Sequence, residues 1–326
     1  TLTGAIAGAD VGVKDAWKLT AGDSRVVVAI FDQGIAISHP DLKDALWCND
    51  AEINGTDGKD DDGNGYVDDK YGYNFAEDKG KPSYGYNADH GTHVAGTVAA
   101  VNNNSIGVCG VAGGDLKKKI PGAKLMSCQI FEGKKSGSGA EAIKWSADHG
   151  AVISQNSWGY PTLTSTPESV KSAVDYFEKY AGVDENGKQT GPMKGGLVIF
   201  AAGNEGKNTS SSDYEKILSV TSVGADYKRA YYTCYGAWAD VAATGGDAKK
   251  GNQVVSTIPG NKYGKMQGTS MACPHVSGLA ALALAKFGGD GYTSSALRKQ
   301  IEDNTTDIAS FNTGYELGKG LINAYK

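Results

Sequence analysis

Continuous apolar runs alternate along this chain with segments that have helical spacing. Residues 25–31 contain an apolar, β-branched run without polar interruption, which is typical of a strand covered on both faces of a parallel sheet. Comparable runs recur through the sequence, and several end at a glycine or a small polar residue. We expect further strands at 124–131, 152–159, 196–202, 219–225, 238–243 and 254–259.

Helical segments separate these runs. Residues 89–100 carry small side chains at close spacing, and an apolar run with helical spacing begins near residue 270. Capped or amphipathic patterns predict further helices at 137–150, 167–180 and 291–301. Alternating strands and helices are typical of a mostly parallel β-sheet sandwiched by helices on both faces. The predicted fold class is therefore α/β.

A single domain over residues 1–326 accounts for this pattern, because no internal repeat or proline-rich linker divides the chain. The segment 160–195 is interpreted as an insertion, within which 184–193 predicts a surface loop or a hairpin. Residues 47–75 form a second distinctive segment, which is rich in aspartate.

Composition excludes several classes of function. The net charge is −5 and no basic block is present, so nucleic-acid binding is not expected. No apolar run reaches the ~18 residues of a membrane-spanning helix, so no membrane span is expected either. The sequence begins Thr-Leu-Thr without a signal segment, which predicts a processed or truncated product.

The five cysteines show no CxxC motif, so neither a thiol-redox site nor a zinc ribbon is indicated. Cys109 and Cys128 lie in apolar surroundings and are interpreted as small core residues. Five free thiols are expected, and a single disulfide is the alternative.

Ser270 lies where a short polar turn enters an apolar helix, in the segment 268–278. Unpaired N–H groups and the helix dipole favour negative charge at such a position. A hydroxyl there can act as a nucleophile if a base lies beside it. An ordinary N-cap serine is the alternative interpretation.

Other polar residues follow the predicted strands. Asp32 ends the first strand, at the carboxyl edge where α/β sheets carry their sites, although a turn or cap aspartate would look the same. Asn204 is framed by glycines after another strand, where a turn asparagine is the alternative. His90 and His93 share a helix face, but the glutamate of a zinc-protease helix is missing.

The acidic segment 47–75 concentrates carboxylates that repel one another unless they are solvated or joined to a cation. Its spacing resembles that of a calcium-binding EF-hand loop, but Tyr71 stands where the twelfth-position glutamate would be. A hard-cation loop is therefore predicted, and a solvated acidic loop is the alternative. The candidate ligands are Asp60, Asp62, Asn64, Tyr66 and Asp68.

Four segments together resemble the subtilisin family of serine endopeptidases, the subtilases. They contain Asp32, His90, Asn204 and Ser270 in that order, which is the order of the subtilisin triad with its additional asparagine. The resemblance covers about three quarters of the chain, and Gln33 departs from the serine or threonine usual in the family.

The resemblance implies peptide-bond hydrolysis through an acyl-enzyme at Ser270. His90 would be the general base, Asp32 would orient it, and the Asn204 amide would donate to the oxyanion. His93 would make a structural hydrogen bond instead. The substrate pocket would be framed by Ser157, Trp158, Gly159, Ala201, Ala202 and Gly203.

The resemblance also implies structural calcium. Subtilases often carry calcium near the acidic segment, and residues 101–110 resemble a loop that holds a second calcium with Asp41. This loop is one residue longer than usual, and Asn103 is the candidate ligand within it. Leu2 lies near the usual N-terminal ligand.

The resemblance implies further properties that are usual among subtilases. They are polypeptide substrates, synthesis as a zymogen with an N-terminal propeptide, a monomeric state, and secretion or a cell-surface or periplasmic location.

Two other classes of protein compete with this interpretation. An esterase of the α/β-hydrolase type would show Gly-x-Ser-x-Gly and the order Ser, Asp, His, which this chain lacks. A non-enzymatic binding module would be a relative that had lost its catalytic residues, yet Asp32, His90 and Ser270 are all present.

Overall fold

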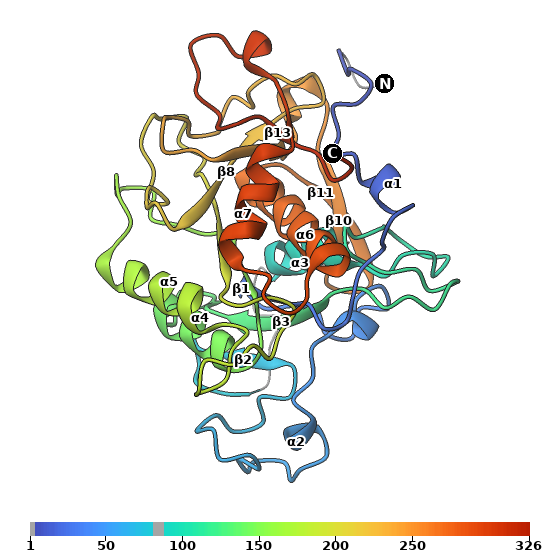
Figure 1. Cartoon of the computed structure of the whole chain (residues 1–326), viewed down its shortest axis with the longest axis vertical. Coiled ribbons are helices and arrows are strands. Elements are labelled where there is room, and N and C mark those ends of the chain that lie inside the picture. Colours follow the sequence, from blue (N-terminus) through green and yellow to red (C-terminus); the bar gives the residue numbers. More distant parts are fainter. Residues whose placement is uncertain (1–3, 81–87) are drawn as a thin grey trace.

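The computed structural model describes residues 4–80 and 88–326. A nine-stranded sheet runs through the molecule in the order β12-β13-β9-β8-β7-β6-β1-β3-β2 (Figure 1). All neighbouring strands are parallel except the terminal pair β12 and β13. The strands are β1 (Val27–Asp32), β2 (Gly72–Asn74), β3 (Lys124–Gln129), β6 (Ile153–Asn156), β7 (Leu197–Ala201), β8 (Ile217–Val223), β9 (Val241–Thr244), β12 (Thr305–Thr306) and β13 (Leu321–Ile322).

Strand β1 shows why its sequence is apolar throughout. Val28 and Ile30 belong to one core cluster, whereas Ala29 and Phe31 belong to another. Successive side chains of a strand point to opposite faces, so both faces of the sheet are covered. The two apolar cores lie on either side of the sheet.

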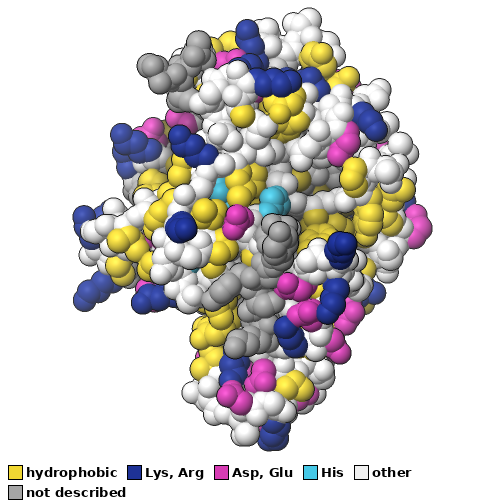
Figure 2. Space-filling view, turned by 180° about the vertical axis from the view of Figure 1, so that it is seen from behind, with side chains coloured by type: hydrophobic (Ala, Val, Ile, Leu, Met, Phe, Trp, Pro, Cys, Tyr) yellow, Lys and Arg dark blue, Asp and Glu magenta, His cyan; other side chains and the backbone are white. Residues whose placement is uncertain are grey.

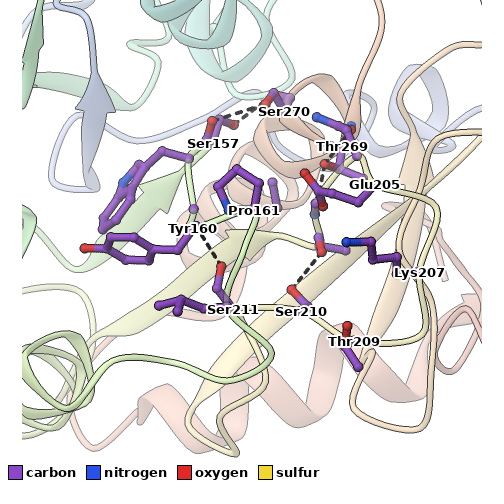
Figure 3. Close-up of a pocket in the computed structure, with 17 residues that line it drawn as sticks. Ser157, Tyr160, Pro161, Glu205, Lys207, Thr209, Ser210, Ser211, Thr269 and Ser270 are labelled. Carbon is purple, nitrogen blue, oxygen red and sulfur yellow. Dashed lines mark hydrogen bonds between the residues drawn. The ribbon is translucent and has the colours of Figure 1, made fainter. Parts of the chain in front are cut away.

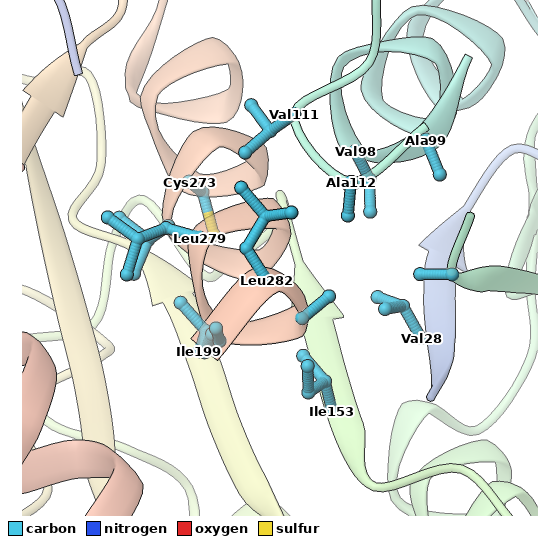
Figure 4. Close-up of a cluster of buried hydrophobic side chains, with 14 of the residues drawn as sticks. Val28, Val98, Ala99, Val111, Ala112, Ile153, Ile199, Cys273, Leu279 and Leu282 are labelled. Carbon is cyan, nitrogen blue, oxygen red and sulfur yellow. The ribbon is translucent and has the colours of Figure 1, made fainter. Parts of the chain in front are cut away.

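Helices cover the two faces separately. The longest helix, α6, packs with α3 against one face, where its apolar side chains meet those of the central strands (Figure 4). Helices α4 and α5 pack together on the other face. The predicted α/β sandwich is therefore confirmed. The helices are α1 (Val13–Ala16), α2 (Asp50–Ile53), α3 (Asp89–Ala99), α4 (Gly139–Asp148), α5 (Glu168–Tyr180), α6 (Thr269–Phe287) and α7 (Ser294–Asp303).

Within residues 4–80 and 88–326, two short antiparallel strand pairs lie outside the main sheet. The predicted strand 254–259 forms β10 (Val254–Ile258), which pairs with β11 (Lys262–Met266) as a hairpin rather than joining the large sheet. This hairpin packs on α3 and leads directly into α6. The other pair joins β4 (Phe131–Glu132) to β5 (Lys135–Ser136).

All five cysteines are free, as expected. Cys128 is buried in the middle of β3, which confirms its predicted place in the core. The prediction for Cys109 is wrong, because this residue is exposed. It lies in the irregular connection between α3 and β3, where no helix or strand turns its side chain inward.

The acidic segment 47–75 forms a lobe at the lower end of the molecule in Figure 1 and contains helix α2. The segment 160–195 contributes helix α5 and then an irregular loop closed by an antiparallel bridge between Val183 and Gln189. Over the described residues, no helix is both long and apolar enough to cross a membrane.

Candidate active site

The predicted catalytic and substrate-binding residues lie at one edge of the sheet. Asp32 is the last residue of β1, and Ser157 and Asn204 follow the adjacent strands β6 and β7. Ser270 is the second residue of α6, which packs across these strands. The carboxyl ends of parallel strands form the usual site of α/β sheets. Figure 2 shows histidine side chains that reach the surface near the middle of one face.

His90 and Asp32 form a close pair. The Nδ1 atom of His90 lies 2.9 Å from Oδ1 and 2.8 Å from Oδ2 of Asp32. Gly91 makes this approach feasible, because a Cβ there would lie 2.4 Å from the Gly34 carbonyl oxygen and 3.0 Å from Asp32 Cβ. Helix α3 can therefore press against the end of β1. The backbone N–H of Gln33 donates to Asp32 at 2.8 Å, so the carboxylate is held from two sides.

Opposing influences act on the protonation of His90. Burial disfavours the imidazolium, but the charge of Asp32 and its hydrogen bond outweigh this cost and raise the pKa of His90. Asp32 is almost fully buried, whereas the imidazole is partly exposed. With its Nδ1 proton directed to Asp32, neutral His90 presents Nε2 as a proton acceptor.

The neighbouring His93 has a different environment. Its Nε2 lies 3.1 Å from the backbone oxygen of Val254, so the ring joins α3 to β10. Burial lowers the pKa of His93 to about 4, and the ring is neutral at physiological pH. This contact agrees with the structural hydrogen bond expected for His93.

Ser270 is tied to the end of β6 by two reciprocal hydrogen bonds. Its hydroxyl donates to the carbonyl of Ser157 at 3.1 Å, and the Ser157 hydroxyl donates to the carbonyl of Ser270 at 2.9 Å (Figure 3). Pro274 lies four residues further along α6 and has no N–H to offer the Ser270 carbonyl. Ser157 therefore supplies the donor that the helix lacks.

The amide of Asn204 has a defined orientation. Its Oδ1 accepts the backbone N–H of Thr269 at 2.9 Å and the Thr269 hydroxyl at 3.0 Å. A backbone N–H can only donate, so the atom facing it is the amide oxygen. The Nδ2 group is directed away from Thr269 and makes no hydrogen bond to the described residues. Thr269 thus holds the oxygen side of the Asn204 amide.

A cavity of about 170 Å³ adjoins Ser270 and Asn204 (Figure 3). Its two walls come from the segments after β6 and β7, and they are joined where the Tyr160 N–H donates to the Ser211 hydroxyl at 2.9 Å. The six residues expected to bind substrate all line this cavity. They are Ser157, Trp158, Gly159, Ala201, Ala202 and Gly203.

The acidic lobe brings together three carboxylates. Oxygens of Glu52, Asp62 and Asp69 all lie within 4.8 Å of one another. Glu52 and Asp69 are buried, and burial raises the pKa of Asp69. One oxygen of Asp68 is buried without a hydrogen-bond partner among the described residues. Such a donor set suits a hard cation.

The other predicted ligands in this lobe mainly shape its turns. The Asp60 carboxylate accepts the backbone N–H groups of Gly63, Asn64 and Gly65. The Asn64 amide oxygen accepts the N–H of Tyr66, whose hydroxyl donates to Glu141. Asp68 accepts the N–H of Gly58.

Of this cluster, only Asp62 was predicted as a ligand, whereas Glu52 and Asp69 were not. Glu52 belongs to α2 and precedes the closely spaced aspartates, so the spacing of those aspartates did not indicate it as a ligand.

The second candidate site surrounds Asp41, which is fully buried. Its carboxylate accepts the side-chain amide of Asn104 at 2.5 Å and the N–H of Val108 at 3.0 Å. Asn103, the predicted ligand, turns instead toward Asp115. Leu2 lies outside the described residues.

Known proteins resemble this chain over most of its length. A family model described as the subtilase family matches residues 23–320. The "Thermophilic serine proteinase" of Bacillus sp. strain AK1 is 34% identical over 95% of this chain and 63% of its own length. Subtilisin E of Bacillus subtilis strain 168 is 32% identical over 92% of this chain and 65% of its own length. The chain thus spans less than two thirds of these two relatives.

Other relatives are matched nearly end to end. Thermitase from Thermoactinomyces vulgaris is 31% identical over 95% of this chain and 91% of its own length. A solved protease structure from Pseudoalteromonas arctica PAMC 21717 has a TM-score of 0.65 and 29% identity, covering 97% of this chain and 92% of that one. The family match agrees with the parallel sheet and with the meeting of the four segments at its edge. The chain therefore belongs to the subtilase family of subtilisin-like serine proteases.

Proposed function

We propose that this chain is a serine endopeptidase in which Ser270 is the nucleophile, His90 the general base and Asp32 the residue that orients His90. The observation that carries the proposal is the contact of His90 Nδ1 with both oxygens of buried Asp32. This contact leaves Nε2 available at the same edge of the sheet as Ser270. Such an arrangement is the functional core of a serine protease triad.

In this mechanism Ser270 Oγ turns from the Ser157 carbonyl toward His90. The oxygen forms a bond to the substrate carbonyl carbon while its proton passes to His90 Nε2. As the peptide C–N bond breaks, the imidazolium returns this proton to the leaving amine. Water then attacks the acyl-enzyme, again with His90 as base, and releases the carboxylic acid product. Asp32 keeps the Nδ1 proton in place throughout.

The negative oxygen formed in each step needs preorganised donors. Asn204 Nδ2 supplies one, because Thr269 fixes the opposite side of the amide. The backbone N–H of Ser270 supplies another, since the first N–H groups of a helix have no acceptor within it. The positive end of the α6 dipole adds to their effect.

The cavity beside Ser270 would receive the substrate side chain that precedes the cleaved bond. The segment Ser157-Trp158-Gly159 would pair with the substrate backbone as an added strand. At Gly159 a Cβ would lie 2.9 Å from Ser211 Oγ, so the absence of a side chain there leaves room in the wall of the cavity. Extended polypeptides are therefore the proposed substrates.

Calcium is proposed as a structural ligand, as is general among subtilases. In the acidic lobe, Glu52, Asp62 and Asp69 would hold the ion, and its charge would offset their mutual repulsion. Asp41 and Asn104 would contribute to a second site. Neither ion takes part in the chemistry at Ser270.

Family membership supports three further proposals about the whole protein. They are an N-terminal propeptide removed on maturation, a monomeric mature enzyme, and an extracellular or periplasmic location, since extracellular action is common among subtilases.

The test is cleavage of an unfolded protein such as reduced casein, because ester hydrolysis would not separate a protease from an esterase. Ser270→Ala should abolish cleavage and leave the fold intact, whereas the control Ser295→Ala in α7 should retain it. Persistent casein cleavage by pure Ser270→Ala protein would refute the assignment of the nucleophile.

A further inference from the structure

The cavity beside Ser270 carries two opposite charges that do not neutralise each other. Glu205 and Lys207 both line it (Figure 3) and follow Asn204 on the loop after β7. Within the described part of the chain, no ion pair joins Glu205 to Lys207 or to another cation. The position of each charge therefore determines which substrate side chains the cavity accepts.

Glu205 is held in place by a buried thiol. Cys234 Sγ lies 3.2 Å from Glu205 Oε2, and the Cys234 side chain is shielded from solvent by the surrounding chain. Burial raises the pKa of Cys234, so the thiol keeps its proton at neutral pH. It can therefore donate a hydrogen bond to the Glu205 carboxylate. The backbone N–H of Cys234 donates to the Gly203 carbonyl at 3.0 Å, which fixes the thiol beside the cavity wall.

Gly203 completes this arrangement. A Cβ at this position would lie 2.7 Å from Glu205 Oε2 and 3.2 Å from Cys234 Sγ. The carboxylate thus rests directly against the bare backbone of the wall. The backbone φ of Gly203, +102°, is also one that residues other than glycine rarely adopt. Backbone and thiol together confine the negative charge to the mouth of the cavity.

We propose that Cys234 is a positioning residue for substrate selection: by fixing the Glu205 carboxylate at the cavity wall, it makes lysine or arginine favourable immediately before the cleaved bond. This inference rests on the proposed function and adds to it the class of side chain selected. It also gives a role to a cysteine that takes part in no disulfide.

The negative charge of Glu205 should affect substrate selection more than the positive charge of Lys207, because only Glu205 is held in place by another side chain within residues 4–80 and 88–326. Lys207 has a flexible stem and no ion pair among the described residues, so its ammonium can move into water when a cationic side chain enters. Glu205 is restrained instead, because the Cys234 thiol donates a hydrogen bond to its carboxylate. Without the thiol, Glu205 can turn toward Lys207 two residues along the loop, and the two charges then cancel.

The test uses three peptides that differ only in lysine, methionine or glutamate before the cleaved bond, and it compares kcat/KM among variants of the whole chain. The unaltered protein should prefer lysine to methionine. Cys234→Ala should lower this ratio by about fivefold, the scale of an exposed ion pair. Cys234→Ser keeps a donor and should restore the ratio.

Additional variants distinguish positioning from a general loss of structure. Cys234→Val fills the same space without a donor, so it should lower the ratio even if Cys234→Ala fails to fold. Lys207→Gln should raise the ratio. Glu205→Gln should lower it, and adding Cys234→Ala to Glu205→Gln should cause no further change, because the thiol acts only through Glu205.

The outcomes separate this inference from the proposed function. A lysine-to-methionine ratio that stays unchanged in folded Cys234→Val protein would overturn the inference alone, as would a preference for glutamate. A Cys234→Ser variant that behaves like Cys234→Val would also overturn it. Failure of the unaltered protein to cleave any peptide would overturn the proposed function, and the inference with it.

Discussion

At the scale of single residues, the orientation of the Asn204 amide supports the role proposed for it. The same side chain could bind the substrate in its ground state or stabilise an oxyanion, and the two roles differ in whether its hydrogen bond strengthens in the transition state. Thr269 donates to Oδ1 through both its N–H and its hydroxyl, so Nδ2 is the group left for the substrate. A donor of this kind acts mainly in the transition state, where the carbonyl oxygen becomes negative.

Asn204→Ala should therefore lower kcat by about 10²–10³-fold with little change in KM, the loss typical of one oxyanion donor and measured in subtilisin itself. Steady-state kinetics on one peptide substrate provide the check. Asn208→Ala, on the same exposed loop, should behave like the unaltered protein. If Asn204→Ala instead raised KM and spared kcat, Asn204 would be a residue of substrate binding.

The raised pKa of His90 makes a second prediction at this scale. General-base catalysis requires the neutral ring, so kcat/KM should rise with pH as His90 loses its proton. Because Asp32 stabilises the imidazolium more than burial disfavours it, the midpoint of this rise should lie above the ordinary histidine value of 6.5. A pH profile with no acidic limb, or one centred below that value, would contradict the role given to His90.

The resemblance to the subtilases singled out Asp32, His90, Asn204 and Ser270 as candidate site residues. From their places at the ends of regular elements alone, a turn or cap residue was an equal alternative for Asp32, Asn204 and Ser270. Cys234 could not be found in the same way. Its contact with Glu205 joins residues 29 positions apart, and neither sits in a pattern that indicates the other. Thr269 was visible beside Ser270, but its hydrogen bonds to Asn204 were not.

At the scale of elements, the start of helix α6 is joined to the end of strand β6 by hydrogen bonds between Ser270 and Ser157. Pro274 removes the helical donor to the Ser270 carbonyl, and Ser157 replaces it from the end of β6. The proposed nucleophile is thereby fixed relative to the proposed substrate-binding segment. Neither periodicity nor propensity predicts such a junction, because it depends on how two distant elements pack.

The acidic lobe is the element whose stability should depend on calcium. It has little apolar core of its own, and its carboxylates repel one another without a cation. An ion present at 100 times its Kd would add about 2.7 kcal/mol to the free energy of unfolding. Excess chelator should therefore lower the melting temperature of the unaltered protein.

Two aspartates of this lobe offer a matched comparison. Asp62→Asn should reduce the effect of calcium on the melting temperature, because Asp62 belongs to the carboxylate cluster. Asp57→Asn should preserve the effect, because Asp57 is highly exposed and pairs with Lys70. A melting curve of the unaltered protein that ignores chelator would favour a solvated acidic loop.

At the scale of the whole molecule, the sequence predicted the α/β class and most elements, because buried strands and helices leave local patterns. The strand order was not accessible, since β1 lies between β3 and β6 through contacts far apart in the chain. The hairpin of β10 and β11 was likewise indistinguishable from a sheet strand by its residues alone. These features depend on tertiary packing.

The arrangement of the sheet explains why one edge carries the site. Parallel strands direct their carboxyl ends to the same edge, so Asp32, Ser157 and Asn204 converge although they are far apart in sequence. Helices α3 and α6 then bring His90 and Ser270 from one face of the sheet. The central claim is that these parts form one activated nucleophile.

That claim is tested most directly by reaction with a fluorophosphonate probe in the presence of calcium, followed by mass spectrometry of the labelled peptide. We predict label on Ser270 that disappears in His90→Ala and persists in the control His149→Ala. Absence of label in folded, calcium-supplied protein, or label that survives in His90→Ala, would contradict an activated Ser270.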